Sequence, residues 1–301
     1  MKDKQALKET AELIRDFLML QKRVAQIESW IESVKDDGRV HGKVITNGAV
    51  TGRMTHSSPN MAQIPNAGSI YGPECRECWT VEDGNVLVGC DASGLELRML
   101  AHYMKDEDYV RTVTEGSSKL GTDVHTVNQR AAGLATRDAA KTFIYAFLYG
   151  AGDAKIGSIV GGSAKEGGKL KSKFLGQTPA LASLLERVKR ISAKGYVPGL
   201  DGRLIWVRSE HAALNSLLQG AGAIVMKKAL CIFYDKIKAN KWPVKLVANV
   251  HDEFQFECPK EIAEDAGKAA RMSIIEAGEF YKLRCPLDGE YKIGRNWRET
   301  H

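Results

Sequence analysis

Long apolar runs are absent from this sequence of 301 residues. No stretch approaches the roughly 20 apolar residues that cross a bilayer, so we expect no membrane span. The opening, MKDKQALKET, is too polar for a secretory signal. Cysteine is also scarce, because six cysteines in a chain of this size do not make a disulfide framework. Together these features predict a protein of the reducing cytoplasm.

A strong charge of one sign is lacking as well. The formal net charge is +6, which favours a polyanionic partner only weakly, since many enzymes that never bind nucleic acid are equally basic. Lys165, Lys169, Lys171 and Lys173 crowd one stretch, either as a solvated helix face or as part of a surface for a polyanion. The hydrophobic content of 44% is that of an ordinary globular protein with one large domain or two closely packed ones.

The apolar pattern predicts a small antiparallel sheet that is interrupted by helices. We expect a first helix over residues 4–34 and buried strands at NVLVGCD (85–91) and KLVANV (245–250), the second turning back as FQFEC. Helices are expected almost without break from about 123 to 193. The other expected elements are a helix in SGLELRMLAHYM (93–104), a hairpin in GYVPGLDGRLIWVR (195–208), and helices over about 209–239 and 260–278. This is an α+β pattern with a helical insert between roughly 106 and 195.

Two of the expected strands end on acids. Asp91 follows LVGC, and Asp252-Glu253 follows LVANVH. If the strands are neighbours, the carboxylates meet at one edge of the sheet and repel each other unless cations neutralise them. A pair of Mg²⁺ ions that clamps a phosphoryl transfer is a common solution. The alternative for either acid alone is a turn cap at the end of a strand.

A second signal lies in RDAAKTFIYAFLYG (137–150). Arg137, Lys141, Tyr145 and Tyr149 fall at successive steps of four residues, so they form one stripe on a helix. Two cations followed by two aromatic rings suit a nucleotide, because the cations meet phosphates and the rings pack on sugar and base. The alternative is an amphipathic helix whose basic end is solvated.

Five motifs in this order resemble those of the family A DNA polymerases, with wording most like the replicative polymerases of short-tailed phages. They are TGRMTHSSPNMAQIP, DASGLELR, RDAAKTFIYAFLYG, HAALNSLLQGAGA and VHDE. The resemblance runs from about residue 36 to 297. It implies a polymerase palm, made of a small antiparallel sheet with helices, into which a helical fingers segment is inserted.

The resemblance also implies a catalytic site. Asp91 and Asp252, with the Ala92 carbonyl, would bind two Mg²⁺ ions, and Glu253 would flank the primer end as a further catalytic residue. The residues that would bind the nucleotide are Ala92, Gly94, Glu96, His125, Arg137, Lys141 and Tyr145, of which His125, Arg137 and Lys141 would hold the triphosphate and take part in catalysis.

Individual roles follow from the same resemblance. Lys141 would help pyrophosphate to leave, Tyr145 would lie against the incoming sugar, and Glu96 would exclude a 2′-hydroxyl. The expected contacts with primer–template DNA are Arg53, Tyr149, Asn215, Gln219 and His251. Because Glu96 disfavours ribonucleotides, an RNA polymerase is the weaker interpretation.

Four segments are expected from the resemblance: the end of a thumb (1–35), the first part of the palm (36–105), the fingers (106–195) and the second part of the palm (196–301). Family members usually carry an exonuclease-like domain and a full thumb before these motifs. Only the segment 1–35 precedes the region of resemblance in this sequence, so we expect no proofreading. The resulting hypothesis is a DNA polymerase core that extends a primer with dNTPs. It would act alone or as one part of a split enzyme, with a separate exonuclease and thumb subunit or a processivity factor. The alternative is a non-catalytic remnant that binds primer–template. In either case a phage protein would act in the bacterial cytoplasm, without a membrane.

Overall fold

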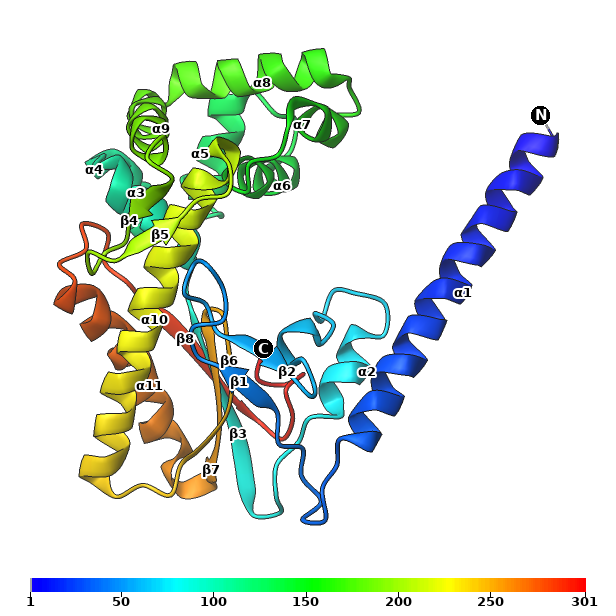
Figure 1. The fold of residues 1–301 in the computed structure, drawn as a ribbon, viewed down its shortest axis with the longest axis vertical. Coiled ribbons are helices and arrows are strands. Elements are labelled where there is room, and N and C mark those ends of the chain that lie inside the picture. Colours follow the sequence, from blue (N-terminus) through cyan, green and yellow to red (C-terminus); the bar gives the residue numbers. More distant parts are fainter. Residues whose placement is uncertain (1) are drawn as a thin grey trace.

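The structure is a computed structural model that describes residues 2–301 (Figure 1). Its elements follow in the order α1 (Lys2–Glu32), β1 (Lys43–Ile45), β2 (Thr55–Ser57), η1 (Met61–Gln63), α2 (Gly72–Glu77), β3 (Asn85–Ala92), α3 (Leu95–Met104), α4 (Glu107–Glu115), α5 (Val124–Ala132), α6 (Arg137–Leu148), α7 (Asp153–Ile159), α8 (Ala164–Gln177), α9 (Pro179–Ser192), β4 (Tyr196–Pro198), β5 (Leu204–Trp206), η2 (Glu210–Ala212), α10 (Ala213–Asn240), β6 (Lys245–Val250), β7 (Glu253–Pro259), η3 (Lys260–Ile262), α11 (Ala263–Phe280) and β8 (Gly289–Gly294). The predicted α+β class is confirmed.

A four-stranded antiparallel sheet of order β6-β7-β3-β8 lies at the centre of the molecule. The two strands predicted to be buried are both in it, with β3 paired to β7 and β8, and β6 paired to β7. The prediction of burial is wrong for β6, which is an edge strand with Leu246 and Val247 47% and 41% exposed. Val88, Cys90 and Phe254 are fully buried on the face that packs against the helices. Because side chains alternate along a strand, Asp91 lies on the opposite face, directly across from Glu253.

The helical insert forms a separate group at one end of the molecule. Figure 1 shows α5 to α9 gathered beyond the sheet, joined to it through α3 and α10. The cluster of four lysines lies on or beside α8, where Lys171 makes an ion pair with Asp153 at 2.9 Å and donates to the Ala151 carbonyl at 2.7 Å. At least one of these lysines therefore holds the insert together instead of facing solvent freely.

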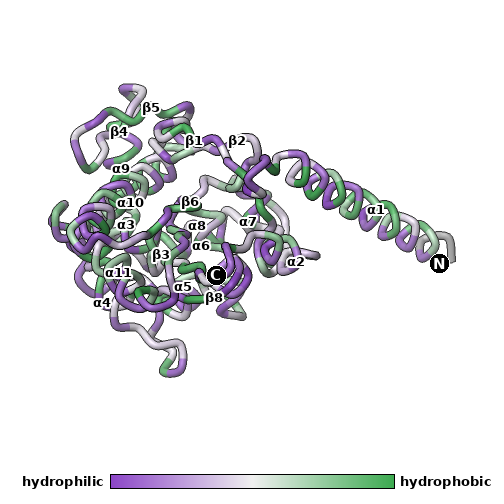
Figure 2. The backbone as a smooth tube through the Cα atoms, turned by 90° about the horizontal axis from the view of Figure 1, so that it is seen from below, coloured by the Kyte–Doolittle hydropathy of each residue, from purple (hydrophilic) through white to green (hydrophobic). Residues whose placement is uncertain are grey.

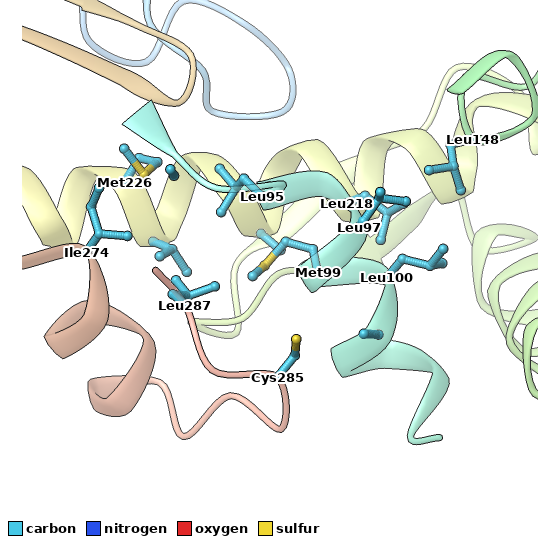
Figure 3. Close-up of a cluster of buried hydrophobic side chains, with 14 of the residues drawn as sticks. Leu95, Leu97, Met99, Leu100, Leu148, Leu218, Met226, Ile274, Cys285 and Leu287 are labelled. Atoms are coloured by element: carbon cyan, nitrogen blue, oxygen red, sulfur yellow. The ribbon is translucent and has the colours of Figure 1, made fainter. Parts of the chain in front are cut away.

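One hydrophobic core joins the insert to the sheet. The side chains labelled in Figure 3 are Leu95, Leu97, Met99, Leu100, Leu148, Leu218, Met226, Ile274, Cys285 and Leu287, and all of them are at least nine-tenths buried. Leu148 comes from the end of α6, whereas most of the others come from α3, α10 and α11. Since the cluster is continuous, a movement of the insert must be accommodated by repacking around this point.

The first helix projects from the body (Figures 1 and 2). Leu7, Leu13 and Phe17 are 71%, 71% and 63% exposed. Near the other end of α1, Trp30 is buried in an edge-to-face contact with Trp79, with 5.4 Å between the ring centroids. The helix is thus anchored through its last turns, and its apolar side chains form an uncovered stripe.

The longest apolar helix lies inside the fold. Within residues 2–301, Glu210–Asn240 is the one helical segment long and apolar enough to cross a membrane, and 61% of its most apolar part is buried. Lys227 and Lys228 interrupt it, so the search of the sequence for long uninterrupted apolar runs did not identify it. Its burial against α3 and α11 is typical of a core helix, and its composition is only weak evidence for a membrane span.

Candidate active site

Two strand ends bring Asp91 and Asp252 together. Asp91 lies one residue before the end of β3, and His251-Asp252 forms the two-residue turn between β6 and β7. The Ala92 N–H donates a hydrogen bond of 2.9 Å to the Asp252 carbonyl, which ties this turn to the end of β3. His251 adopts the left-handed conformation at φ +59°, as tight reversals of this kind often require. The two strands are in one sheet, but they are not neighbours as the sequence argument required, because β7 lies between them and the β6–β7 turn brings Asp252 to the end of β3.

The two carboxylates are electrostatically strained. Burial, followed by the nearby charges of Asp252 and Glu253, raises the pKa of Asp91 to about 7 from an ordinary value of 3.8. Burial also raises the pKa of Asp252, although Arg53 opposes this change. Both effects disfavour the ionised carboxylates as long as no cation lies between them. A divalent cation would relieve this repulsion.

The donor set at the sheet edge is compatible with Mg²⁺. Within residues 2–301, no group of three or more His, Cys, Asp and Glu side chains could hold a metal ion. The edge offers two carboxylates, together with the carbonyl of Ala92, which is adjacent to Asp91. Mg²⁺ typically takes one or two protein carboxylates and completes its shell with waters and substrate phosphates. The predicted ligands therefore fit an open magnesium site, and a closed structural site is not formed.

Glu253 is held by the last residues of the chain. Its carboxylate accepts hydrogen bonds from Trp297 Nε1 at 2.7 Å and from Gln255 Nε2, and it lies 3.2 Å from His301 Nδ1. Burial alone would raise the pKa of Glu253, but hydrogen bonds from His301, Gln255 and Trp297 outweigh it, so the pKa is lowered. The acid is thus kept ionised by protein groups. Sequence reasoning did not identify Trp297 or His301, because no local pattern connects them with a glutamate some 44 residues away.

Helix α6 presents the predicted cations and rings on one side. Phe143 and Ile144 are fully buried, whereas Lys141 is exposed and Tyr145 is partly exposed. Arg137 opens the helix, with its side chain 41% exposed. The stripe predicted from spacing four residues apart therefore exists as an accessible face.

An acid that the sequence did not single out orients Arg137. Asp123 Oδ1 accepts a hydrogen bond of 3.0 Å from Arg137 Nε and forms an ion pair with Arg137 Nη2 at 2.9 Å. Although burial opposes ionisation, the bonds from Arg137 and Thr126 lower the pKa of Asp123 to about 2. Asp123 also caps α5 by accepting from the His125 N–H at 3.1 Å. The cap signal Thr-Asp before an apolar run was the available clue.

His125 lies beside this ion pair with unused hydrogen-bonding capacity. Its Nδ1 atom is buried and has no hydrogen-bond partner among residues 2–301. Burial and the charges of Arg137 and Lys141 lower its pKa, whereas Asp123 opposes them. The ring centroid is 6.2 Å from that of Tyr145. A buried polar atom without a partner suits a position that a ligand completes.

Glu96 joins the start of α3 to the end of α6. It lies in the first turn of α3, just after Gly94 with φ +57°, and accepts a hydrogen bond of 3.1 Å from Arg53 Nη2. The Tyr149 hydroxyl lies 2.9 Å and 3.1 Å from its two carboxylate oxygens. Burial and the Glu96 charge raise the pKa of Tyr149. Three residues predicted to touch the sugar, the template and the primer are therefore in one hydrogen-bonded group.

The remaining predicted DNA contacts lie nearby. Asn215 and Gln219 are one turn apart near the start of α10, and both are partly exposed. A Cβ placed on Gly220 would be 3.5 Å from the Thr51 carbonyl, so α10 closely approaches the loop that carries Arg53. Partial burial, Arg53 and His56 lower the pKa of His251.

The fold has a known structural counterpart. The POL domain of Pol1 from M. smegmatis, in complex with DNA primer–template and dNTP, matches with a TM-score of 0.83 and 25% sequence identity, over 95% of this chain and 52% of that one. The architecture is thus that of a polymerase domain.

Sequence comparisons identify the family. The family model for DNA polymerase family A matches residues 2–299, and the chain belongs to this family. The DNA-directed DNA polymerase of Enterobacteria phage T3 is 44% identical over 96% of this chain, and that of Escherichia phage T7 is 43% identical over the same share. The thermostable DNA polymerase I of Thermus aquaticus is 28% identical over 97% of the chain. This chain spans 46% of the length of each phage relative and 37% of the Thermus enzyme.

Proposed function

We propose that this chain is the catalytic core of a template-directed DNA polymerase that adds dNTPs to a primer 3′ end with two Mg²⁺ ions. The observation that carries the proposal is the pair Asp91 and Asp252, joined through the Ala92–Asp252 hydrogen bond, in a chain that also presents the cationic and aromatic face of α6. Membership of DNA polymerase family A supports the same assignment.

In the proposed reaction the primer 3′-oxygen attacks the α-phosphorus of the nucleotide. The bond from this phosphorus to the bridging oxygen breaks, pyrophosphate leaves with that electron pair, and the hydroxyl proton passes to water. Asp91 and Asp252 would hold the Mg²⁺ ions, which would supply neutralisation of the negative charge that develops during the transfer. Arg137, Lys141 and His125 bind the triphosphate, and Lys141 stabilises the departing pyrophosphate. Glu253 flanks the primer end.

The sugar is selected by the palm. Glu96 and Tyr145 form the floor and side of the proposed sugar site, where a 2′-hydroxyl would meet the partly buried Glu96 carboxylate. Gly94 allows α3 to begin close to the proposed sugar site, because the left-handed backbone conformation needed there is readily adopted by glycine. Tyr149 lies at the position of the templating base, and Arg53, Asn215, Gln219 and His251 contact the primer–template minor groove.

A separate subunit with exonuclease and thumb, or a processivity factor, is proposed as a protein partner. The exposed apolar side chains of α1, including Leu7, Leu13 and Phe17, support such a partner, since uncovered apolar stripes commonly mark interfaces. The proposed location is the cytoplasm of a bacterial host.

Primer extension tests the proposal. Purified chain, primer–template, dNTPs and Mg²⁺ are expected to give extension, and Asp91→Asn or Asp252→Asn is expected to lower the rate by at least about a thousandfold, since each removes transition-state charge stabilisation. Asp235→Asn, which changes an exposed aspartate of α10, is the matched control and should extend normally. Extension that survives Asp252→Ala would refute the two-metal assignment. Tight primer–template binding without any extension would favour the non-catalytic alternative.

A further inference from the structure

The hairpin of β4 and β5 has two different faces. Tyr196 pairs with Trp206 and Pro198 with Leu204. Ile205 is buried against the core at 1% exposure, whereas Leu204 and Trp206 on the other face are 52% and 63% exposed. Trp206 also contacts Tyr196 edge to face, with 6.0 Å between the centroids. A short hairpin thus holds an indole ring rigidly at the surface with an aromatic neighbour beneath it.

Two cations extend this outer face. The Val207 N–H donates to the Gly195 carbonyl at 3.0 Å, so the hairpin pairing continues one step beyond the strands. Lys194 lies in the turn just before β4 and Arg208 lies two residues after Trp206, and both are exposed at this end of the hairpin. Neither forms an ion pair with another residue of the described chain, whereas nearby Arg203 is paired with Asp201. The outer face therefore combines a free positive charge with an exposed aromatic ring.

The hairpin lies beside the proposed DNA path. A Cβ placed on Gly52 would be 3.3 Å from Arg203 Nη1, so the hairpin tip reaches the loop that carries Arg53. The buried Ile205 lies against Gly220, next to Gln219 of α10. Figure 1 shows β4 and β5 beside α10, next to α9 of the helical insert. The hairpin is thus adjacent, through its tip and its buried face, to the elements that carry Arg53 and Gln219.

We propose that this outer face binds the unpaired template strand, with a base stacked on Trp206 and phosphates bound by Lys194 and Arg208. The inference rests on the proposed polymerase function and adds a binding site for single-stranded nucleic acid to it. An unpaired base offers a free ring face, whereas bases inside a duplex are already stacked. Aromatic rings flanked by cations are the common means of holding single strands without reading their sequence.

The test compares two fluorescently labelled duplexes. One is blunt-ended, and the other has a template 5′ overhang of about ten nucleotides, which is within the length of single strand that such surfaces cover. Trp206→Ala is expected to weaken binding of the overhang substrate by about fivefold or more, and to change binding of the blunt duplex by less than about twofold. Phe280→Ala removes a ring of similar exposure (60%) on α11 and should change neither. Trp206→Phe keeps a stacking ring and should retain most of the affinity.

Two further readouts separate stacking from a general loss of structure. The overhang substrate should quench the emission of Trp206, which is the part of the tryptophan emission that the wild type has and Trp206→Phe lacks. Arg208→Ala should lower the slope of log affinity against log salt by about 0.7 for the overhang substrate, which is the loss of one phosphate contact on a single strand. If Trp206→Ala is misfolded, it loses affinity equally for both duplexes. The proposal is then tested by comparing the quenching of tryptophan emission in the wild type and in Trp206→Phe.

The outcomes are distinct for the two proposals. Wild-type chain that extends primers but binds the overhang regardless of the residue at position 206 overturns this inference alone. Binding that depends on Trp206, without any primer extension, overturns the polymerase proposal alone. Equal loss of affinity in the phenylalanine and alanine variants, or no quenching, shows that the ring does not stack on a base and overturns the inference as well.

Discussion

Asp91→Asn is expected to stabilise the metal-free chain above neutral pH. In the folded chain the pKa of Asp91 is raised to about 7, first by burial and then by Asp252 and Glu253, whereas its ordinary value is 3.8. Between these values the folded chain keeps a proton that the unfolded chain has lost, so stability falls as pH rises and the full penalty is present above about pH 7. A difference of about three pH units corresponds to at most about 4 kcal/mol. Since the introduced amide must itself find hydrogen bonds, we expect a gain of about 1 to 3 kcal/mol.

Urea unfolding in EDTA at about pH 5 and about pH 8 measures this effect, with the free energy of unfolding extrapolated to water. The variant should exceed the wild type at the higher pH, and its advantage should shrink at the lower one. Asp235→Asn, at an exposed position, should show no such pH dependence. Mg²⁺ should reduce the advantage, because an ion that binds only the folded wild type stabilises it. A variant less stable than the wild type at the higher pH in EDTA would show that Asp91 is not electrostatically strained.

Three further changes probe separate parts of the site. Glu96→Ala should raise ribonucleotide incorporation by at least about tenfold, measured as the ratio of rNTP to dNTP efficiency. The reason is that the unfavourable contact between the Glu96 carboxylate and a 2′-hydroxyl is worth about 1.4 kcal/mol or more. An unchanged ratio would show that Glu96 does not select the sugar. Lys141→Ala should lower kcat by about a hundredfold in single-turnover extension while template affinity is unchanged, since its proposed role is in the transition state; an equal loss of template binding would contradict that role. Trp297→Phe should cost about 1 to 3 kcal/mol in urea unfolding, because buried Glu253 loses its 2.7 Å donor; the exposed Trp206→Phe is the control, and equal effects would argue against the bond.

The fold could be predicted where the signal is local and strong. NVLVGCD and KLVANV are apolar runs of strand length, and both became strands of the central sheet. The short elements β2 and α2, of 3 and 6 residues, were not expected, because one turn of helix or three extended residues leave no periodicity to detect. Their positions depend on packing against distant parts of the chain.

The candidate site shows the same division. Spacing of four residues placed Arg137 and Lys141 on one face of α6, since helix geometry alone decides this. Asp123, which orients Arg137, and Trp297, which binds Glu253, were missed as partners because each contact joins separate elements. The Mg²⁺ ligands and the limits of the proposed palm and fingers segments stay predictions that the proposed experiments address.

In the proposed function, Glu96 would couple recognition of the sugar to recognition of the template. In the free chain its carboxylate is satisfied by both Arg53 and Tyr149, one proposed to contact the primer–template minor groove and the other to lie at the templating base. Either DNA or nucleotide must therefore compete with bonds between protein groups as it enters. Leu148, the neighbour of Tyr149, is buried in the common core and fixes the backbone at the end of α6, whereas the Tyr149 ring is 50% exposed and can leave Glu96 by rotation of its side chain. The proposed nucleotide contacts lie at one end of α6 and the proposed template contact lies at the other, so both would act on the same helix.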